Sequence, residues 1–325
     1  MRLATVESGG PDGRLVVVSS DQSRAVPASG IAATLQDALD RWADVEADLR
    51  GLGTALESNQ AAGAIPFNGS LAPLPRAWQW LDGSAFESHT SLMSTLFGTE
   101  KISGERPLMY QGISNQFYGP AENVPFLSEE DGIDFEGEFG VIVDQVPMGT
   151  SVDHAARHIR LIVQINDWSL RRLAPIEMKT GFGWVQAKPP CSVAPVAVTP
   201  DELGAAWRDG RVALPLVVEW NGRHFGAPNG RAMSYSFPEL IAHAARTRHL
   251  CAGTIIGSGT VSNSNFREVG SSCIAERRAI ELLDKGASET PFMAFGDIVR
   301  MEARGLDGTP LFGAIQQKVV PAARP

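Results

Sequence analysis

The sequence has only three cysteines, and their positions do not favour disulfides or a structural metal site. Cys191, Cys251 and Cys273 are odd in number, widely separated and form no CxxC pair. This spacing excludes a disulfide framework and argues against a zinc site built on paired thiolates. Free thiols are typical of a reducing compartment, so we expect a cytoplasmic protein whose fold depends on its apolar core.

Positive charge and long apolar runs are also scarce. The 325 residues include 28 lysines and arginines, of which only five are lysines, and 37 acidic residues, so the formal net charge is −9. Binding of nucleic acid needs a basic surface that neutralises phosphates, and this balance argues against it. No uncharged apolar run reaches the roughly 18 residues of a bilayer span, and the opening MRLATVESGGPDG does not resemble a signal peptide. We therefore expect no membrane partner.

The first seventy-odd residues have the pattern of a small separate unit. Two apolar strands are expected at residues 2–6 and 15–18, on either side of a glycine-rich turn. Apolar residues at helical spacing predict a long helix from residue 31 to about residue 56. A segment rich in proline, alanine and glycine follows at residues 61–77. These patterns predict a small N-terminal α/β domain over residues 1–75.

Residues 76–325 alternate short strands with turns and are expected to form the larger domain. The Asn221-Gly222 pair after one apolar stretch is a strong signal for a hairpin turn. Short helices are expected at residues 153–158, 238–246 and 275–285. The pattern predicts an α+β, strand-rich body that contains the chemistry, with strands at residues 139–143, 194–198, 214–220 and 298–302.

Two glutamates form the most informative pattern in this body. Glu136 and Glu138 stand at the start of an expected strand, so their side chains point to the same face, roughly 6–7 Å apart. Such carboxylates repel each other unless a cation lies between them, and a hard divalent ion with oxygen ligands is the natural candidate. A solvated strand face is the alternative explanation.

Three more residues extend this pattern. Asp167 follows a mostly apolar run, and it could complete the protein's share of a Mg²⁺ or Ca²⁺ shell or could instead cap a turn. Asp82 and His89 are seven residues apart, next to a helical pattern at residues 84–97, so two helical turns would bring them towards one side. Alternatively, Asp82 is only the N-cap of this helix and His89 is a structural histidine.

Lys188 is a rare lysine in a chain that favours arginine, and Pro189 and Pro190 rigidify the segment after it. A fixed ammonium near a metal could hold a substrate carboxylate or an oxyanion, and an exposed loop lysine is the alternative. The glycine-rich passage at residues 253–262 lacks the GxxxxGK[ST] order of a phosphate loop. Tight turns, or close approach of the backbone to a ligand, explain this passage better than nucleotide binding.

The order of these features resembles that of the fumarylacetoacetate hydrolase family. The Asp-x6-His pair precedes four further elements, which are Tyr-Gln-Gly from Tyr110, Glu-Gly-Glu from Glu136, Asn-Asp-Trp-Ser from Asn166, and Gly-Ser-Gly-Thr ending at Thr260. The resemblance extends from about residue 78 to the C-terminus, and the N-terminal unit resembles the small domain of longer members. It implies a mixed β-sandwich roll that is usually dimeric and binds Mg²⁺, Mn²⁺ or Ca²⁺.

The resemblance also implies a metal site and a catalytic set. The metal ligands would be four carboxylates: Asp82, Glu136, Glu138 and Asp167. His89 would be the general base that activates water, oriented by Glu276, and Arg171 would stabilise a developing oxyanion together with Lys188. Substrate contacts are expected from Tyr110, Lys188 and Thr260.

Three positions depart from the fumarylacetoacetases. Ala174 stands where the resemblance places a glutamine of the oxyanion hole, Gly98 where it places an arginine, and Ser84 where it places a tyrosine. We therefore expect metal binding and water activation to be retained, with a substrate other than fumarylacetoacetate. The resulting hypothesis is a homodimeric, metal-dependent hydrolase that cleaves a C–C bond of an acylpyruvate-like 1,3-diketo acid in aromatic-compound catabolism.

Two alternatives stand beside this hypothesis. A metal-stabilised enolate would also serve decarboxylation, hydration or tautomerisation of a 2-oxo acid, and the ligand set does not separate these reactions from hydrolysis. Asp82 with His89 favours hydrolysis, because an enolate-only reaction needs no activated water. A non-catalytic binding protein is the other alternative, and only Ala174 and Gly98 favour it.

Overall fold

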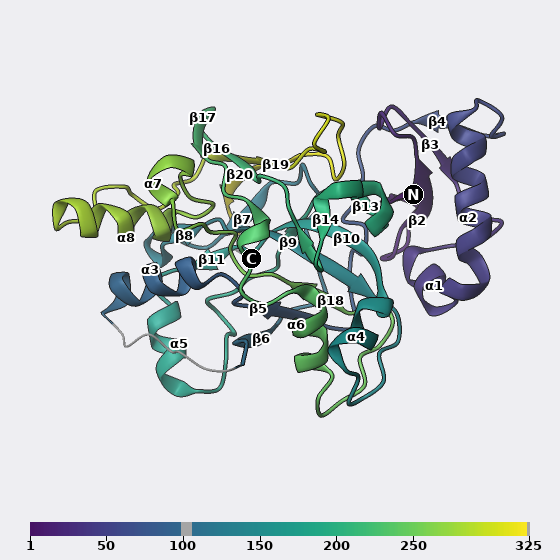
Figure 1. The fold of residues 1–325 in the computed structure, drawn as a ribbon. Helices are drawn as coiled ribbons and strands as arrows, with labels where there is room; N and C mark the ends of the chain where they lie inside the picture. Colours follow the sequence, from purple (N-terminus) through teal and green to yellow (C-terminus); the bar gives the residue numbers. More distant parts are fainter. Residues whose placement is uncertain (99–105, 324–325) are drawn as a thin grey trace.

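The computed structural model describes residues 1–98 and 106–323, and its main feature is one large mixed sheet of 11 strands (Figure 1). The strand order is β4 (Ile65–Pro66), β3 (Arg24–Pro27), β2 (Arg14–Val18), β1 (Arg2–Val6), β13 (Ala197–Val198), β10 (Ile159–Asn166), β9 (Gly137–Val143), β18 (Ile255–Gly257), β5 (Trp80–Gly83) and β6 (Met109–Gly112), with β12 (Ser192–Val193) paired to β10. The strand-rich α+β class predicted from the sequence is confirmed.

The strands of the N-terminal unit continue the sheet of the larger body. β1 pairs with β2, as the sequence predicts, and on its other side pairs with β13, so that Leu3 faces Ala197. Helices α1 (Leu35–Asp40) and α2 (Trp42–Glu57) pack on these strands. The single helix predicted from residue 31 is wrong, because the backbone of Arg41 leaves the helical region at φ −125° and ψ 30°. The domain boundary at residue 75 stays a prediction.

A five-stranded sheet packs against the large sheet. Its order is β17 (Arg223–Gly226), β16 (Val217–Trp220), β19 (Ile298–Glu302), β20 (Ile315–Pro321) and β7 (Val124–Phe126). Phe139 of β9 shares a buried core with Met301 of β19 and Ile315 of β20, which makes the body a sandwich. The predicted hairpin is confirmed, since Asn221 and Gly222 join β16 to β17 with φ values of 52° and 71°.

The remaining elements are short. Two small sheets pair β8 (Ile133–Asp134) with β11 (Ser169–Leu170) and β14 (Trp207–Arg208) with β15 (Arg211–Val212). The other helices are α3 (Glu87–Phe97), α4 (Val152–Ala155), α5 (Ala174–Thr180), α6 (Phe237–Ala244), α7 (Phe266–Val269) and α8 (Ile274–Lys285). Of these, α3 confirms the helical pattern at residues 84–97, and α4, α6 and α8 confirm the three short helices predicted in this body. Over residues 1–98 and 106–323, no helix combines the length and the apolar character of a membrane span.

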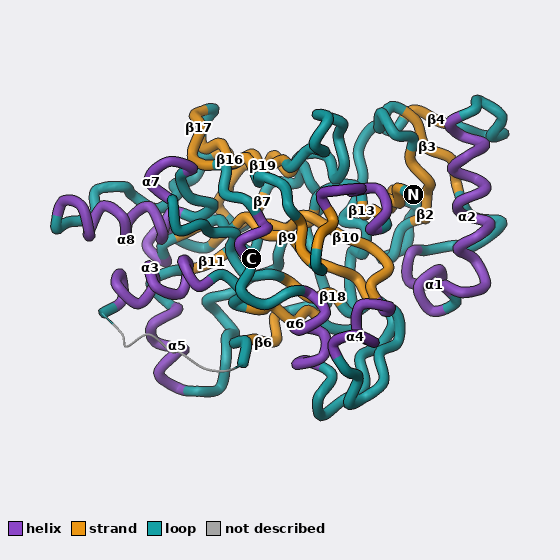
Figure 2. Tube along the Cα trace, in the orientation of Figure 1, coloured by secondary structure: helices purple, strands orange, loops and turns teal. Residues whose placement is uncertain are grey.

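Most of the helices lie towards two ends of the molecule. Figure 2 shows α1 and α2 at one end and α3, α5, α7 and α8 near the other, while α4 and α6 lie between these ends, below the central strands in this view. At the second end, α3 and α8 pack together through Leu92, Ala279 and Ile280. This pair of helices lies beside the central strands and completes the surroundings of the candidate site.

Candidate active site

The central strands of the large sheet bring three acidic residues to one place. Asp82 lies on β5, Glu138 lies on β9, and Asp167 follows the last residue of β10. Between β5 and β9 runs β18, whose Gly257 is level with Asp82. A Cβ at Gly257 would lie 2.3 Å from Asp82 Oδ1, so only glycine leaves space for this carboxylate.

The three residues form a compact buried set, here called the acidic cluster. The ligand atoms of Asp82, Glu138 and Asp167 all lie within 4.8 Å of one another. Asp82 accepts the Gly259 N–H at 3.0 Å, whereas neither oxygen of Glu138 has a hydrogen-bond partner among the described residues. Burial raises the pKa of Glu138 well above its usual value, and Asp82 and Asp167 raise it further. Burial and Asp167 likewise raise the pKa of Asp82.

Glu136 is also buried but has the opposite surroundings. Its carboxylate forms ion pairs with Arg171 and with Lys188. Although burial opposes the shift, these two cations hold the pKa of Glu136 well below its usual value. Glu136 and Glu138 both line one cavity, as strand alternation predicts. The alternative of a solvated strand face is wrong, because the two residues are 3% and 0% exposed.

Asp167 is fixed by three side-chain donors. Lys188 Nζ lies 2.5 Å from its Oδ2, and the Tyr110 hydroxyl donates to the same oxygen at 2.7 Å. The Cys191 thiol donates to Oδ1 at 3.0 Å. Burial and Asp167 raise the pKa of Tyr110 well above its usual value, so the phenol stays protonated as a donor. The capping alternative for Asp167 and the exposed-loop alternative for Lys188 are therefore wrong.

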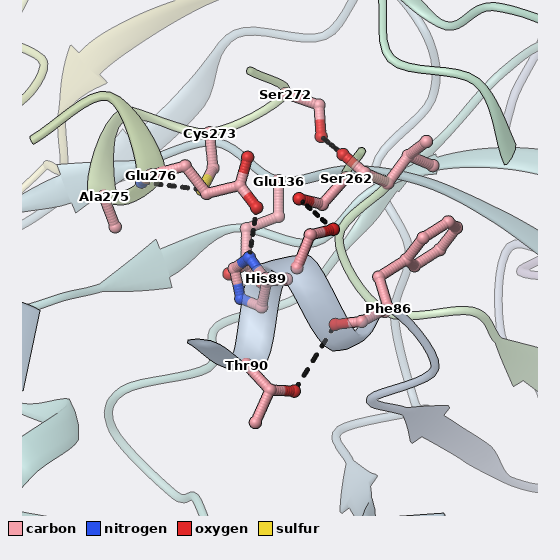
Figure 3. Close-up of polar contacts among 12 residues, drawn as sticks. Phe86, His89, Thr90, Glu136, Ser262, Ser272, Cys273, Ala275 and Glu276 are labelled. Carbon is pink, nitrogen blue, oxygen red and sulfur yellow. Dashed lines mark hydrogen bonds and ion pairs between the residues drawn. The ribbon is translucent and has the colours of Figure 1, made fainter. Parts of the chain in front are cut away.

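His89 is held by a carboxylate from a second helix. His89 on α3 places Nδ1 2.9 Å from Oε1 of Glu276, which lies in the first turn of α8 (Figure 3). Since a carboxylate accepts, the neutral imidazole carries its proton on Nδ1 and keeps a lone pair on Nε2. Glu276 is 0% exposed, so its position is fixed by packing. The placement of Asp82 and His89 on one helix is wrong, because Asp82 lies on β5 and Phe86 is the N-cap of α3.

These groups meet in a cavity of about 290 Å³. Its charged end includes Asp82, Glu136, Glu138, Arg171 and Lys188, and His89, Tyr110 and Thr260 also line it. Asp167 and Glu276 stand directly behind lining residues through the contacts given above. The structure therefore brings together every residue that the sequence analysis proposed for the site, while their individual roles stay predictions.

Asp134 is a buried carboxylate that the sequence analysis missed. It accepts Arg171 Nε at 2.8 Å and the backbone N–H groups of Ile274 and Ala275 at 2.7 and 2.9 Å. These N–H groups begin α8, so Asp134 connects the helix that carries Glu276 to Arg171. The alternation that relates Glu136 to the next glutamate extends back to Asp134 and could have identified it. The sequence offers no comparable signal for the missed thiol of Cys191.

The acidic cluster fits a hard divalent cation. Its donors are carboxylate oxygens, which Mg²⁺, Mn²⁺ and Ca²⁺ prefer. A buried carboxylate without a partner is costly; both oxygens of Glu138 lack a hydrogen-bond partner among the described residues, and one of them lies within 4.8 Å of a carboxylate oxygen of each of the other two acids. A second group with ligand atoms within 4.8 Å consists of His89, Cys273 and Glu276. In that group, however, the imidazole and the carboxylate already bond to each other.

Comparison with curated proteins finds hydrolases at moderate identity. A 2,4-didehydro-3-deoxy-L-rhamnonate hydrolase of Sphingomonas sp. (strain SKA58) is 27% identical over 157 residues, which cover 47% of this chain and 52% of the relative. A fumarylacetoacetase of Emericella nidulans is 30% identical over 225 residues, covering 58% of this chain and 51% of the relative. The chain thus spans about half the length of the curated relatives it matches.

Solved structures share the fold over nearly the whole chain. Maleylpyruvate hydrolase from Sphingobium sp. SYK-6, in complex with manganese(II) and pyruvate, has a TM-score of 0.66 at 18% identity, covering 99% of this chain and 100% of the other. A 5-carboxymethyl-2-hydroxymuconate delta-isomerase from Mycobacterium smegmatis has a TM-score of 0.62 at 17% identity, covering 100% of both chains. At these identities the likeness concerns the fold alone.

Family models assign almost the entire sequence. The fumarylacetoacetase N-terminal domain 2 model matches residues 1–76, which contain β1 to β4 and the helices α1 and α2. The fumarylacetoacetate (FAA) hydrolase C-terminal model matches residues 79–320, which contain the acidic cluster, His89 and Lys188. The curated relatives named above are hydrolases, which supports an enzyme. The chain belongs to the fumarylacetoacetate hydrolase family.

Proposed function

We propose that this protein is a divalent-metal-dependent hydrolase that cleaves a C–C bond of an acylpyruvate-like 1,3-diketo acid. One observation carries the proposal: two groups of residues meet at the same cavity. The first is an acidic cluster suited to a dication, and the second is a histidine oriented by a buried carboxylate. The related fumarylacetoacetase and the manganese and pyruvate of the similar maleylpyruvate hydrolase structure support it.

Asp82, Glu138 and Asp167 would hold the ion, for which we propose Mg²⁺, with Mn²⁺ or Ca²⁺ as substitutes. Glu136 stays a proposed fourth ligand, although its carboxylate faces Arg171 and Lys188. When bound, a dication would supply Lewis-acid stabilisation of negative charge on substrate oxygens. The chain's own part is to fix Asp167, and Tyr110, Lys188 and Cys191 do so from three directions.

His89 is the proposed general base. Its Nδ1–H is engaged by Glu276, so Nε2 is the nitrogen available to take a proton from water. The resulting hydroxide adds to the acyl carbonyl, and the C–C bond to the enolate fragment breaks. The enolate carbon recovers a proton, so that one water is added across the bond. Glu276 stabilises the imidazolium that forms between these two proton transfers.

Lys188 is the proposed electrostatic partner of the oxyanion. Its ammonium lines the cavity, lies over the Tyr110 ring at 5.5 Å from the centroid and is 11% exposed. A preorganised cation in a site that excludes water stabilises developing negative charge at no cost of reorganisation. Arg171, paired with Asp134 and Glu136, would contribute from the same end of the cavity. Thr260 stays a proposed substrate contact.

Product analysis tests the proposed function. Incubation of the protein and Mg²⁺ with acetylpyruvate in ¹⁸O-labelled water is expected to yield pyruvate and acetate, with the label in acetate. His89→Ala should lower kcat by about 10²- to 10⁴-fold while Mg²⁺ affinity stays unchanged. His154→Ala is the matched control, because His154 is exposed on α4 and should leave kcat unaltered.

Two outcomes would contradict the hydrolase. Loss of CO₂ or a shifted double bond without uptake of the label would indicate the enolate-only alternative. Absence of any product across a panel of acylpyruvates with Mg²⁺ or Mn²⁺ would indicate a binding protein. The resemblance to the family also leads us to propose a cytoplasmic homodimer that acts in aromatic-compound catabolism.

A further inference from the structure

The cavity combines a charged end with an apolar wall. The charged end is formed by Asp82, Glu136, Glu138, Arg171 and Lys188. The apolar side chains that line the cavity come from three segments: Met93 and Phe97 of α3, Leu108 and Met109 at β6, and Met178 and Trp184 of α5 and the loop after it. A ligand that spans the cavity therefore needs a charged head and an apolar arm.

The cations of the cavity are fully engaged. Among the described lining residues, the permanent positive charges are those of Arg171 and Lys188. Arg171 is paired with Asp134 and Glu136, and Lys188 is paired with Glu136 and Asp167. Five carboxylates therefore surround two cations: Asp82, Asp134, Glu136, Glu138 and Asp167. Even with a bound dication, the described lining residues offer no unpaired cation for a second carboxylate of the substrate.

From this charge count and the apolar wall, we infer that the substrate is a monocarboxylic 2,4-dioxo acid with an apolar acyl arm. The inference rests on the proposed function and names its substrate class. The dioxo acid head would meet the charged end, and the arm would contact Met93, Leu108 and Met178. An arm that ends in a carboxylate would lie against thioether and aromatic groups without a counter-ion among the described lining residues, and it would lose the apolar contacts that an alkyl arm makes there. The cavity volume of about 290 Å³ suits a short arm.

A matched pair of substrates tests the inference. Hydrolysis of 2,4-dioxononanoate, whose arm is a pentyl chain, is compared with hydrolysis of a 2,4-dioxo acid of the same length whose arm ends in a carboxylate. The apolar substrate is expected to have a kcat/KM about 100-fold higher or more. Equal values, or a preference for the dicarboxylate, would overturn the inference while leaving the hydrolase in place.

An added cation should reverse part of this preference. Met178 lines the cavity and is 46% exposed, so Met178→Arg can present a guanidinium to the arm without being buried. We expect kcat/KM for the dicarboxylate to rise about 10-fold. Ile176→Arg on the same helix is the control, because Ile176 is 64% exposed and is not among the lining residues. An equal rise in both variants would mean that general surface charge, not the apolar wall, sets the preference.

Calorimetry separates this inference from the proposed function. With Mg²⁺ present, binding of 2-oxononanoate is compared with binding of 2-oxononanedioate, neither of which has the C–C bond that the proposed reaction cleaves. Tighter binding of the monocarboxylate by about 10-fold or more supports the apolar arm even if no dioxo acid is hydrolysed. Tighter binding of the dicarboxylate contradicts the inference whether or not the protein is a hydrolase.

Discussion

Glu136 and Glu138 are separated by one residue, are both buried and line the same cavity, yet their surroundings shift their pKa values in opposite directions. Glu136 has Arg171 and Lys188 as partners. Glu138 has Asp82 and Asp167 as neighbours, and its oxygens have no hydrogen-bond partner in the described part of the chain. The protein thus neutralises one glutamate with its own cations and leaves the other for a cation from solution.

This difference has a physical reason in the sheet. Alternation puts both side chains on one face, but the elements that reach that face differ along the strand. Arg171 follows β11 and reaches Glu136, together with Lys188, whereas β5 and the end of β10 bring carboxylates to Glu138. Two glutamates on one strand face therefore differ in pKa because their neighbours differ in charge. The same substitution at both positions tests the comparison directly.

The largest effect is expected for Glu136→Gln. This change leaves Arg171 and Lys188 without their shared anion in a buried site, and removal of one partner from a buried ion pair costs about 3–5 kcal/mol. Urea denaturation should show this loss in the free energy of unfolding. Glu130→Gln, at an exposed position, is the control and should change it by no more than about 0.5 kcal/mol. If Glu136→Gln leaves the free energy of unfolding unchanged, the proposed difference between the two glutamates is wrong.

A smaller effect of opposite sign is expected for Glu138→Gln. In protein treated with a chelator, an amide can donate to Asp82 and Asp167 and removes an unpartnered buried carboxylate, which should stabilise the fold by about 1–3 kcal/mol. Mg²⁺ at about 100 times its Kd should stabilise the wild type by about 2.7 kcal/mol and should leave Glu138→Gln unchanged. Thermal unfolding with and without Mg²⁺ measures both. Destabilisation of the chelated variant would refute the assignment.

The smallest effect is expected for substitution of Glu177, a carboxylate that is partly exposed to solvent. Glu177 on α5 accepts the backbone N–H groups of Val185, Gln186 and Ala187 at 2.9–3.2 Å. Although its slight burial opposes the shift, these bonds lower the pKa of Glu177 below 4.5. Glu177→Gln should therefore cost no more than about 1 kcal/mol.

The pH dependence of the stability of Glu177→Gln tests the direction of this pKa shift. A lowered pKa in the folded state means that Glu177 stabilises the protein above its unfolded pKa near 4.5 and that this contribution is lost as the pH falls below it. The difference between wild type and Glu177→Gln should be constant around neutral pH and should shrink in acid. A difference that grows in acid would show that another group is responsible.

Much of the fold could be predicted because its signals are local. The hairpin at Asn221 follows from a dipeptide that tolerates positive φ at both residues, and the strand at Glu138 follows from alternation. The contact between His89 and Glu276 was predicted from the family resemblance and not from a local pattern, because the two residues lie on helices far apart in the sequence. The order of motifs collected the residues proposed for the site but not Asp134 or Cys191, which also contact them.

The errors arose where tertiary contacts decide. The helix predicted through Arg41 breaks there although its apolar spacing continues, and Asp82 lies in a strand because β18 and β6 provide its hydrogen-bonding partners. The ion pairs of Glu136 with Arg171 and Lys188 could not be derived from the sequence. The sequence does not show whether a cation or another acid lies next to a given carboxylate in the folded chain. Charge neutralisation is a property of the assembled site.

The pairing of β1 with β13 makes the N-terminal unit part of the sheet that carries Asp82 and Glu138. Leu3, Leu15 and Val17 share one buried core with Leu161 and Val163 of β10, although the family models meet between residues 76 and 79. A fragment that begins at residue 77 would present an open strand edge and an uncovered apolar face, the combination that drives aggregation. We therefore expect the border between the family models not to be the border of an independently soluble unit, and expression of residues 77–325 alone should yield aggregates.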